Sequence, residues 1–263
     1  MTSPQDNRAQ KGVNPRYSTG APHGNANTTP TTQQQYFSAS PASADTRHTT
    51  MLTLRGHKVP VQLSNGVFSA KGLDKGTTVL LKLAPTPPAE GHFLDLGCGW
   101  GPIALSLALE SPKAHITALD VNERALDLTR VNAKALGLPG ITPATAEDIP
   151  EDARFDLIWS NPPIRVGKKI LHELLLTYLP RLTQGGAAYL VVQKHLGADS
   201  LIPWLSQSLG RDFEVSRYDS SKGFRIIEVL HTPQNDSDRA ASHKDNNVHI
   251  SDTVAEIDTP SQS

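Results

Sequence analysis

The chain contains only one cysteine, Cys98, among its 263 residues. A single thiol cannot form an internal disulfide bond, and this scarcity fits a reducing compartment. The sequence also lacks a basic-then-apolar leader and any apolar run near the roughly 18 residues of a membrane-spanning helix. We therefore expect a cytoplasmic protein with no membrane partner.

Aliphatic residues are scarce at both ends of the chain. Residues 1–35 are rich in Thr, Gln, Asn, Pro and Gly, and residues 232–263 carry six acidic side chains against two basic ones. Such segments bury too little apolar surface to offset the entropy of ordering. We predict a disordered tail at 1–35, a disordered acidic tail at 232–263, and about 195 ordered residues between them, enough for one domain.

Neither sign of charge is in excess, since 25 Lys and Arg face 26 Asp and Glu. Between the tails the balance is nearly even, so attraction to nucleic acid would have to come from a local patch. No cluster of His, Cys, Asp and Glu has the spacing of metal ligands, and no metal is expected.

The hydrophobic pattern between the tails predicts a hairpin, a short helix, and then alternating strands and helices. Residues 51–68 alternate apolar and polar positions around Gly56-His57 and Asn65-Gly66, which is typical of a hairpin. A short helix follows and ends at Pro85. We then expect strands at 92–96, 115–120, 141–146, 154–160 and 186–194, helices at 102–111, 122–137, 168–182 and 198–210, and a closing hairpin at 213–231.

Repeated strand–helix alternation predicts an α/β fold with a doubly wound parallel sheet and ligands at the carboxyl ends of its strands. The closing hairpin would add an antiparallel strand. We divide the ordered part into a hairpin-and-helix extension at 36–90 and the α/β domain proper at 91–231.

The stretch DLGCGWG, Asp95 to Gly101, ends the first strand of the alternating series and opens a helix. Its glycines permit a tight turn and a close approach to a ligand. A dinucleotide fingerprint would need a glycine where Pro102 stands, and the Asp95 carboxylate would repel a pyrophosphate. That carboxylate favours a cation, such as the ammonium and sulfonium of S-adenosylmethionine. Cys98 is expected to be a small filler of the loop rather than a nucleophile.

Acidic residues follow the next two strands. Asp120 lies 25 residues beyond Asp95 and could accept both hydroxyls of a ribose. Glu147 or Asp148, after the third strand, could accept the amino group of adenine. Any one of them alone could cap a helix or face solvent. Together with the glycine loop they predict a site for S-adenosylmethionine.

The fourth strand is followed by Asn161-Pro162-Pro163. An exocyclic amine is a poor nucleophile because its lone pair is delocalised, and acceptors aimed at its N–H groups can free that pair. Asn161 offers a side-chain carbonyl and Pro162 a backbone carbonyl, while the prolines stiffen the loop. The alternative is that Asn161-Pro162-Pro163 forms a structural turn with no chemical role. His172 and His195 are expected to be surface or core residues rather than general bases.

At these residues the chain resembles the class I S-adenosylmethionine-dependent methyltransferases. DLGCGWGPIAL, LDVNERALDLTRVNA and FDLIWSNPP are similar to that family's first, second and fourth motifs, in order. QYFSASPAS at 35–43, GVFSAKGLDKGTTVLL at 66–81 and SKGFRIIEVL at 221–230 resemble the methyltransferase small domain. Within it, the small-subunit ribosomal RNA guanine-N2 methyltransferases are the most similar type, here in a single-domain form.

The resemblance implies a Rossmann-like sheet of seven strands, mostly parallel, with an antiparallel C-terminal strand. It also implies the cofactor S-adenosylmethionine and a catalytic loop made by Asn161, Pro162 and Pro163. The residues that it assigns to the cofactor are Asp95, Gly97, Gly99, Gly101, Asp120, Val121, Glu147, Asp148 and Asn161.

The Asn-Pro-Pro loop serves adenine-N6, guanine-N2 and glutamine-amide methylation in such enzymes, so the acceptor needs further signals. Ile164 holds a position that is commonly aromatic in the ribosomal enzymes, and it can pack on a base. Five cations could hold phosphates or simply form a solvated face: Arg165, Lys168, Lys169, Lys222 and Arg225. We expect a monomer that methylates guanine N2 in ribosomal RNA; the alternatives are an adenine or glutamine-amide enzyme, or a non-catalytic cofactor- or RNA-binding domain.

Overall fold

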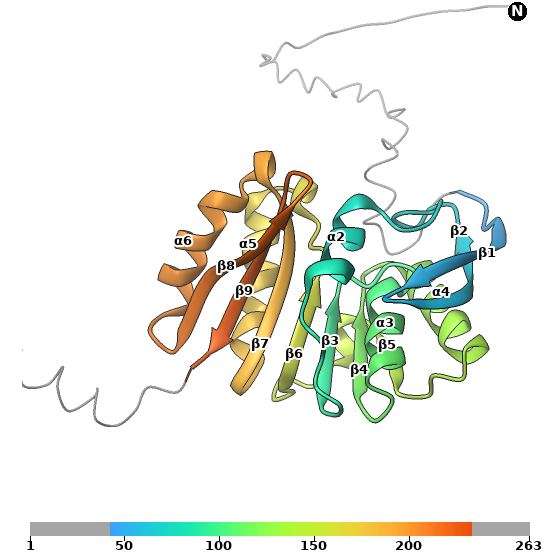
Figure 1. The fold of residues 1–263 in the computed structure, drawn as a ribbon, viewed down its shortest axis with the longest axis horizontal. Helices are drawn as coiled ribbons and strands as arrows, with labels where there is room; N and C mark the ends of the chain where they lie inside the picture. Colours follow the sequence, from blue (N-terminus) through green and yellow to red (C-terminus); the bar gives the residue numbers. More distant parts are fainter. Residues whose placement is uncertain (1–42, 233–263) are drawn as a thin grey trace, which may run out of the picture.

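A computed structural model describes residues 43–232 of the chain (Figure 1). The predictions of disordered tails fall outside these described residues, apart from Thr232. The first described element is the hairpin of β1 (Arg47–Leu54) and β2 (His57–Ser64), an antiparallel two-stranded sheet of its own. Its turn residues Arg55 and Gly56 have φ of 45° and 90°, as a two-residue type I′ turn requires.

The main sheet has seven strands in the order β5-β4-β3-β6-β7-β9-β8. Only β9 runs antiparallel to its neighbours β7 and β8. The prediction of a mostly parallel seven-stranded sheet with an antiparallel C-terminal strand is therefore confirmed. The strands are β3 (His92–Leu96), β4 (His115–Leu119), β5 (Ile141–Ala144), β6 (Phe155–Ser160), β7 (Leu182–Gln193), β8 (Phe213–Ser221) and β9 (Phe224–His231).

Helices connect most of these strands and cover both faces of the sheet. Asn122 caps the helix that follows β4, as predicted, because its Oδ1 accepts from the N–H groups of Arg124 (3.0 Å) and Ala125 (3.4 Å). Asp74 caps the helix of the extension in the same way. The helices are α2 (Lys75–Leu83), α3 (Pro102–Glu110), α4 (Glu123–Ala135), α5 (Lys168–Tyr178) and α6 (Ala198–Leu209).

Two hydrophobic cores lie on opposite faces of the main sheet. The β1–β2 hairpin, α2, α3 and α4 pack on one face, and α5 and α6 pack on the other (Figure 1). Successive residues of a strand point to opposite faces. Leu157 and Trp159 of β6 therefore join the first core, whereas Ile158 joins the second. This alternation directs the residue two positions after Trp159 toward α2.

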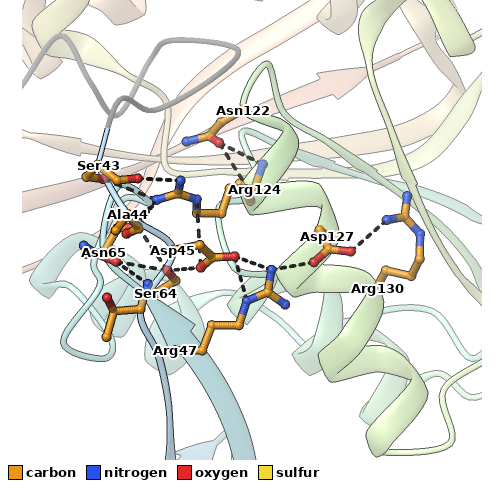
Figure 2. Close-up of polar contacts among 12 residues, drawn as sticks. Ser43, Ala44, Asp45, Arg47, Ser64, Asn65, Asn122, Arg124, Asp127 and Arg130 are labelled. Atoms are coloured by element: carbon orange, nitrogen blue, oxygen red, sulfur yellow. Dashed lines mark hydrogen bonds and ion pairs between the residues drawn. The ribbon is translucent and has the colours of Figure 1, made fainter.

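The first described residues of the extension are fastened to the first turn of α4 (Figure 2). The Arg124 guanidinium donates to the backbone oxygens of Ser43 (2.7 Å) and Asn65 (2.9 Å). Asp45 accepts hydrogen bonds from Arg47, whose guanidinium also pairs with Asp127 of α4 at 2.7 Å. The extension thus adjoins the loop between β4 and α4, at the carboxyl edge of the sheet. Within the described residues, no helix is long and apolar enough to cross a membrane.

Candidate active site

The glycine loop between β3 and α3 has a left-handed backbone at Gly97, Gly99 and Gly101, with φ of 85°, 57° and 92°. Such angles favour glycine because a Cβ would meet the backbone. At Gly101 a Cβ would also lie 2.9 Å from Thr129 Oγ1, so space and conformation both require glycine there. The N–H groups of Gly97 and Cys98 donate to the Leu119 carbonyl, which ties the loop to the end of β4.

Asp95 is fully buried at the carboxyl end of β3. One carboxyl oxygen, Oδ2, accepts from the Ala104 N–H at 2.9 Å and so satisfies a free donor in the first turn of α3. The other oxygen, Oδ1, has no hydrogen-bond partner among the described residues. Burial raises the pKa of Asp95 to about 8, and the neighbouring Asp120 adds to the rise. An unpaired buried carboxyl oxygen of this kind fits a cationic ligand.

Asp120 follows β4 and closes the other side of the loop. Its carboxylate accepts from the N–H groups of Gly99 (2.8 Å) and Asn122 (2.9 Å). Burial raises its pKa, although these backbone hydrogen bonds oppose the rise. A carboxylate has about four acceptor positions, so acceptor capacity remains for a ribose hydroxyl. Val121 beside it is 55% exposed and offers an apolar surface suited to the flat face of a base.

The predicted adenine contacts, Glu147 and Asp148, lie in a short 3-10 turn after β5, and both are exposed. Asp148 is engaged locally, because its Oδ2 accepts from the N–H and the hydroxyl of Thr145, each at 2.8 Å. These hydrogen bonds lower the pKa of Asp148. Glu147 has no such contact among the described residues, so it is the better candidate of the two.

Asn161 lies just beyond β6 on the face that carries α2. Its Nδ2 donates to Asp74 Oδ2 at 2.8 Å and to Thr77 Oγ1 at 3.0 Å. The Pro162 carbonyl accepts from the Ile164 N–H at 2.8 Å, which leaves one of its two lone pairs free. Ile164 itself packs partly against the core under α5 and α6. The sequence did not indicate Asp74 or Thr77; the only signal was their place in the GLDKGT stretch.

A small, open hollow lies between the glycine loop and the start of α2. It brings the predicted Asn161 together with the loop glycines Gly97 and Gly99. Phe68, Leu73 and Ile103 add apolar walls, which the sequence did not indicate. A ligand in this hollow would touch both the cofactor loop and the Asn-Pro-Pro loop.

The predicted cations lie at the carboxyl edge of the sheet, but they differ in exposure and in whether an acidic side chain pairs with them. Arg165, Lys168 and Lys222 are exposed. Lys169 lies 3.9 Å from Glu173, an exposed pair. Arg225 is held by Asp199 at 3.1 Å and its side chain is only 15% exposed. The β8–β9 turn reaches this edge because the Gly223 carbonyl accepts from the N–H of Lys194, a further exposed cation directly after β7.

Three other side chains that the sequence singled out lie apart from the chemistry. Cys98 is buried, and this burial raises the pKa of its thiol, so a thiolate is disfavoured. His172 stacks on Trp204 with ring centroids 3.5 Å apart, and His195 is exposed after β7. Over residues 43–232, no three His, Cys, Asp or Glu side chains come together in a way that could hold a metal ion.

A doubly wound sheet with an unpaired, buried carboxyl oxygen at its glycine loop, and with an Asn-Pro-Pro loop after the neighbouring strand, suits a methyltransferase with a sulfonium methyl donor. Residues 58–228 match the methyltransferase small domain, and the chain belongs to this family. S-adenosylmethionine is the family's methyl donor. The unpaired Asp95 Oδ1 fits its ammonium, the left-handed glycine loop fits a close approach, and the Asp120 carboxylate fits its ribose.

Relatives of known sequence span different shares of the chain. The uncharacterized protein YbxB of Bacillus subtilis is 34% identical over 199 residues, which are 74% of this chain and 98% of that protein. Ribosomal RNA small subunit methyltransferase C of Salmonella typhi is 32% identical over 169 residues, 62% of this chain and 47% of that protein. The chain thus spans about half the length of that second relative.

A solved structure shares the fold. The 16S rRNA N2 methyltransferase RsmC of T. thermophilus, in complex with AdoMet and guanosine, matches with a TM-score of 0.59 at 22% identity. The match covers 73% of this chain and 52% of that one. At this identity the likeness supports the Rossmann-like fold.

Proposed function

We propose that this protein transfers the methyl group of S-adenosylmethionine to an exocyclic amine, namely guanine N2 in ribosomal RNA. The observation that carries the proposal is the Asn161 amide, which lines the hollow beside the glycine loop. Its NH2 group is engaged by α2, and no group within residues 43–232 donates a hydrogen bond to its Oδ1. That oxygen is available to a substrate N–H.

The residues of the loop prepare the amine for attack. Asn161 Oδ1 and the free lone pair of the Pro162 carbonyl accept the two N–H groups, which stabilises the charge that develops on nitrogen. Pro162 and Pro163 restrict the backbone, so both acceptors keep their direction. The bound cofactor supplies the electrophilic methyl group. Asp95 and the glycine loop orient that cofactor.

The carboxyl edge of the sheet supports RNA as the acceptor. Arg165 and Lys168 follow the Asn-Pro-Pro loop, and Lys222 lies in the β8–β9 turn at the same edge (Figure 1). Phosphates held by these cations would leave a flipped base over the hollow, where the exposed part of Ile164 can pack on its face. The names of the relatives, which act on ribosomal RNA, favour guanine N2 over the other acceptors.

The test is methyl transfer from labelled S-adenosylmethionine to ribosomal RNA and ribosomal subunits, followed by nucleoside analysis. We expect N2-methylguanine as the product. Asn161→Ala should lower kcat by about 10²- to 10³-fold with little change in cofactor affinity, because it removes an acceptor used in the transition state. Gln207→Ala, at an exposed amide side chain of α6 on the opposite face of the sheet, is the control and should keep full activity.

Other outcomes would point to the alternatives. Transfer only to a protein glutamine amide, or to adenine N6, would overturn the guanine assignment while retaining the chemistry of Asn161. Cofactor binding without any acceptor in total RNA, ribosomes or protein would support a non-catalytic domain instead.

A further inference from the structure

The Asn161 side chain is held by the first turn of α2, which belongs to the extension rather than to the main sheet. The two acceptors of its NH2 group, Asp74 and Thr77, lie 87 and 84 residues earlier in the chain. Thr77 is only 4% exposed. The contact is therefore partly buried, and a hydrogen bond there is partly shielded from water.

The chemistry of these two partners determines which way the amide points. The Asp74 carboxylate, when ionised, can only accept. The Thr77 hydroxyl gives its proton to Asp74 Oδ2 at 2.5 Å, so its oxygen is left as an acceptor toward Asn161. Both atoms that face Asn161 thus require a donor. The opposite rotamer would press Asn161 Oδ1 against a carboxylate oxygen, and it is disfavoured.

The shape of the same turn leaves room for the amide. Gly76 has a helical backbone, so its conformation does not demand glycine. A Cβ at this position would lie 3.1 Å from Asn161 Oδ1 and 3.2 Å from Nδ2. Asp74 and Thr77 therefore set the direction of the Asn161 amide, and Gly76 leaves the space that it occupies.

We propose that Asp74 and Thr77 are positioning residues that fix the amide of Asn161 with its carbonyl oxygen toward the acceptor amine. This inference rests on the proposed N-methyltransferase function and adds the device that orients its acceptor. It also gives the extension a role in the reaction, because without α2 either amide rotamer of Asn161 could face the substrate.

Four variants test the proposal in the full chain with RNA as substrate. Asp74→Asn keeps the α2 cap, since asparagine is an equally good N-cap. It offers one acceptor oxygen in place of two, however, so Asn161 competes with the Gly76 N–H for that oxygen and the amide loses its fixed direction, with kcat falling by about 10²-fold. Thr77→Val should lower kcat by up to about tenfold, and Thr77→Ser should restore it. Thr78→Val is the matched control, because the Thr78 hydroxyl is exposed and, within residues 43–232, bonds only to the Asp74 backbone oxygen.

A role confined to stability would give a different pattern. The proposal requires that kcat falls while the cofactor Kd and the melting temperature of each variant stay close to those of Thr78→Val. If Asp74→Asn and Thr77→Val were as active as Thr78→Val, or lost cofactor affinity instead of kcat, the proposal would be overturned.

A second readout does not depend on the RNA target. The side-chain NH2 signals of Asn161 can be assigned in ¹⁵N NMR spectra by comparison with Asn161→Ala. Asp74→Asn and Thr77→Val should shift these signals, whereas Thr78→Val should not. Unchanged signals would overturn the positioning role even if the protein proved active. Shifted signals in a protein that methylates no amine would sustain the positioning role and refute the proposed function alone.

Discussion

Asp95 ends β3 in a fully buried position, and burial raises the pKa of its carboxyl to about 8. At neutral pH the empty site therefore keeps the proton on this group. A cation at Oδ1 favours the ionised form, so cofactor binding must release that proton. We predict that the need to release this proton weakens the affinity for S-adenosylmethionine by up to about tenfold for each pH unit below 8. Calorimetric titration with S-adenosylmethionine between pH 6 and 8.5 would measure it.

Asp95→Asn separates this effect from the titration of the cofactor itself. The amino group of the cofactor, like other α-amino groups, titrates near about 8, but it does so equally with both proteins. The variant cannot ionise at position 95. The affinity advantage of the unaltered protein over Asp95→Asn should therefore shrink as the pH falls from 8 to 6. A constant ratio across this range would contradict the prediction.

Single residues differ in how far their roles can be predicted from the sequence. Asp95, Asp120 and Asn161 follow strands of a parallel sheet, and such sheets bring the ends of their strands to one edge. Their shared location was therefore predictable. The hydrogen bonds from Asn161 to Asp74 and Thr77 were not, because they join positions more than 80 residues apart.

At the scale of elements, α2 is fixed at both ends. Asp74 caps its start, and Arg55 of the β1–β2 turn donates to the carbonyls of Leu81 (2.8 Å) and Ala84 (3.0 Å) at its end. Arg55 also pairs with Glu110 of α3 at 2.6 Å, with only 11% of its side chain exposed. Its loss would leave these acceptors poorly satisfied in a partly buried place.

Arg55→Ala should therefore lower the free energy of unfolding by about 2 kcal/mol. Urea denaturation followed by circular dichroism would measure the change. Arg130→Ala is the control, because Arg130 pairs with Asp127 at 3.5 Å on the surface and is 59% exposed. That pair should contribute less than about 0.5 kcal/mol. Equal losses in both variants would argue against a special role for Arg55.

Some observed element boundaries differ from the predicted ones. They differ where prolines and capping side chains, rather than the hydrophobic pattern, set the end of the element. The helix predicted at 168–182 ends at Tyr178 and passes into a 3-10 turn, because Pro180 cannot continue an α-helix. The strand predicted at 141–146 ends at Ala144, where Thr145 and Asp148 cap the following turn. In contrast, β7 begins at Leu182, four residues earlier than predicted, and runs through Gly185 and Gly186 with an irregular register against β6. Periodicity predicts that an element exists, but caps and prolines set its ends.

At the scale of the whole molecule, the strand order brings basic side chains together at one edge of the sheet, although the chain as a whole carries almost no net charge. The formal net charge of the chain is −1. The carboxyl ends of β6 and β7 and the β8–β9 turn nevertheless bring Arg165, Lys168, Lys194 and Lys222 to one edge of the sheet. The order β6-β7-β9-β8 could not be predicted from the sequence, since the hairpin could have joined either edge. The local patch that RNA binding requires depends on this topology.

Removing three of these cations should weaken RNA binding in a salt-dependent way. We expect the triple variant Arg165→Gln, Lys168→Gln, Lys222→Gln to reduce the slope of log K against log salt by roughly 0.7 to 0.9 for each phosphate that the protein no longer neutralises. Because these side chains lie outside the hollow, cofactor affinity should not change. Fluorescence anisotropy with a labelled ribosomal RNA fragment, from 50 to about 300 mM salt, would measure the slope.

The control variant removes the same number of charges from the opposite edge. Lys113, Lys134 and Arg154 are exposed before β4, at the end of α4 and before β6, where the amino ends of the strands lie. Their triple replacement by glutamine has the same effect on net charge and on long-range attraction. A slope that fell equally in both variants would mean that RNA responds only to overall charge. A fall confined to the first variant would locate the RNA at the carboxyl edge, beside the amide of Asn161.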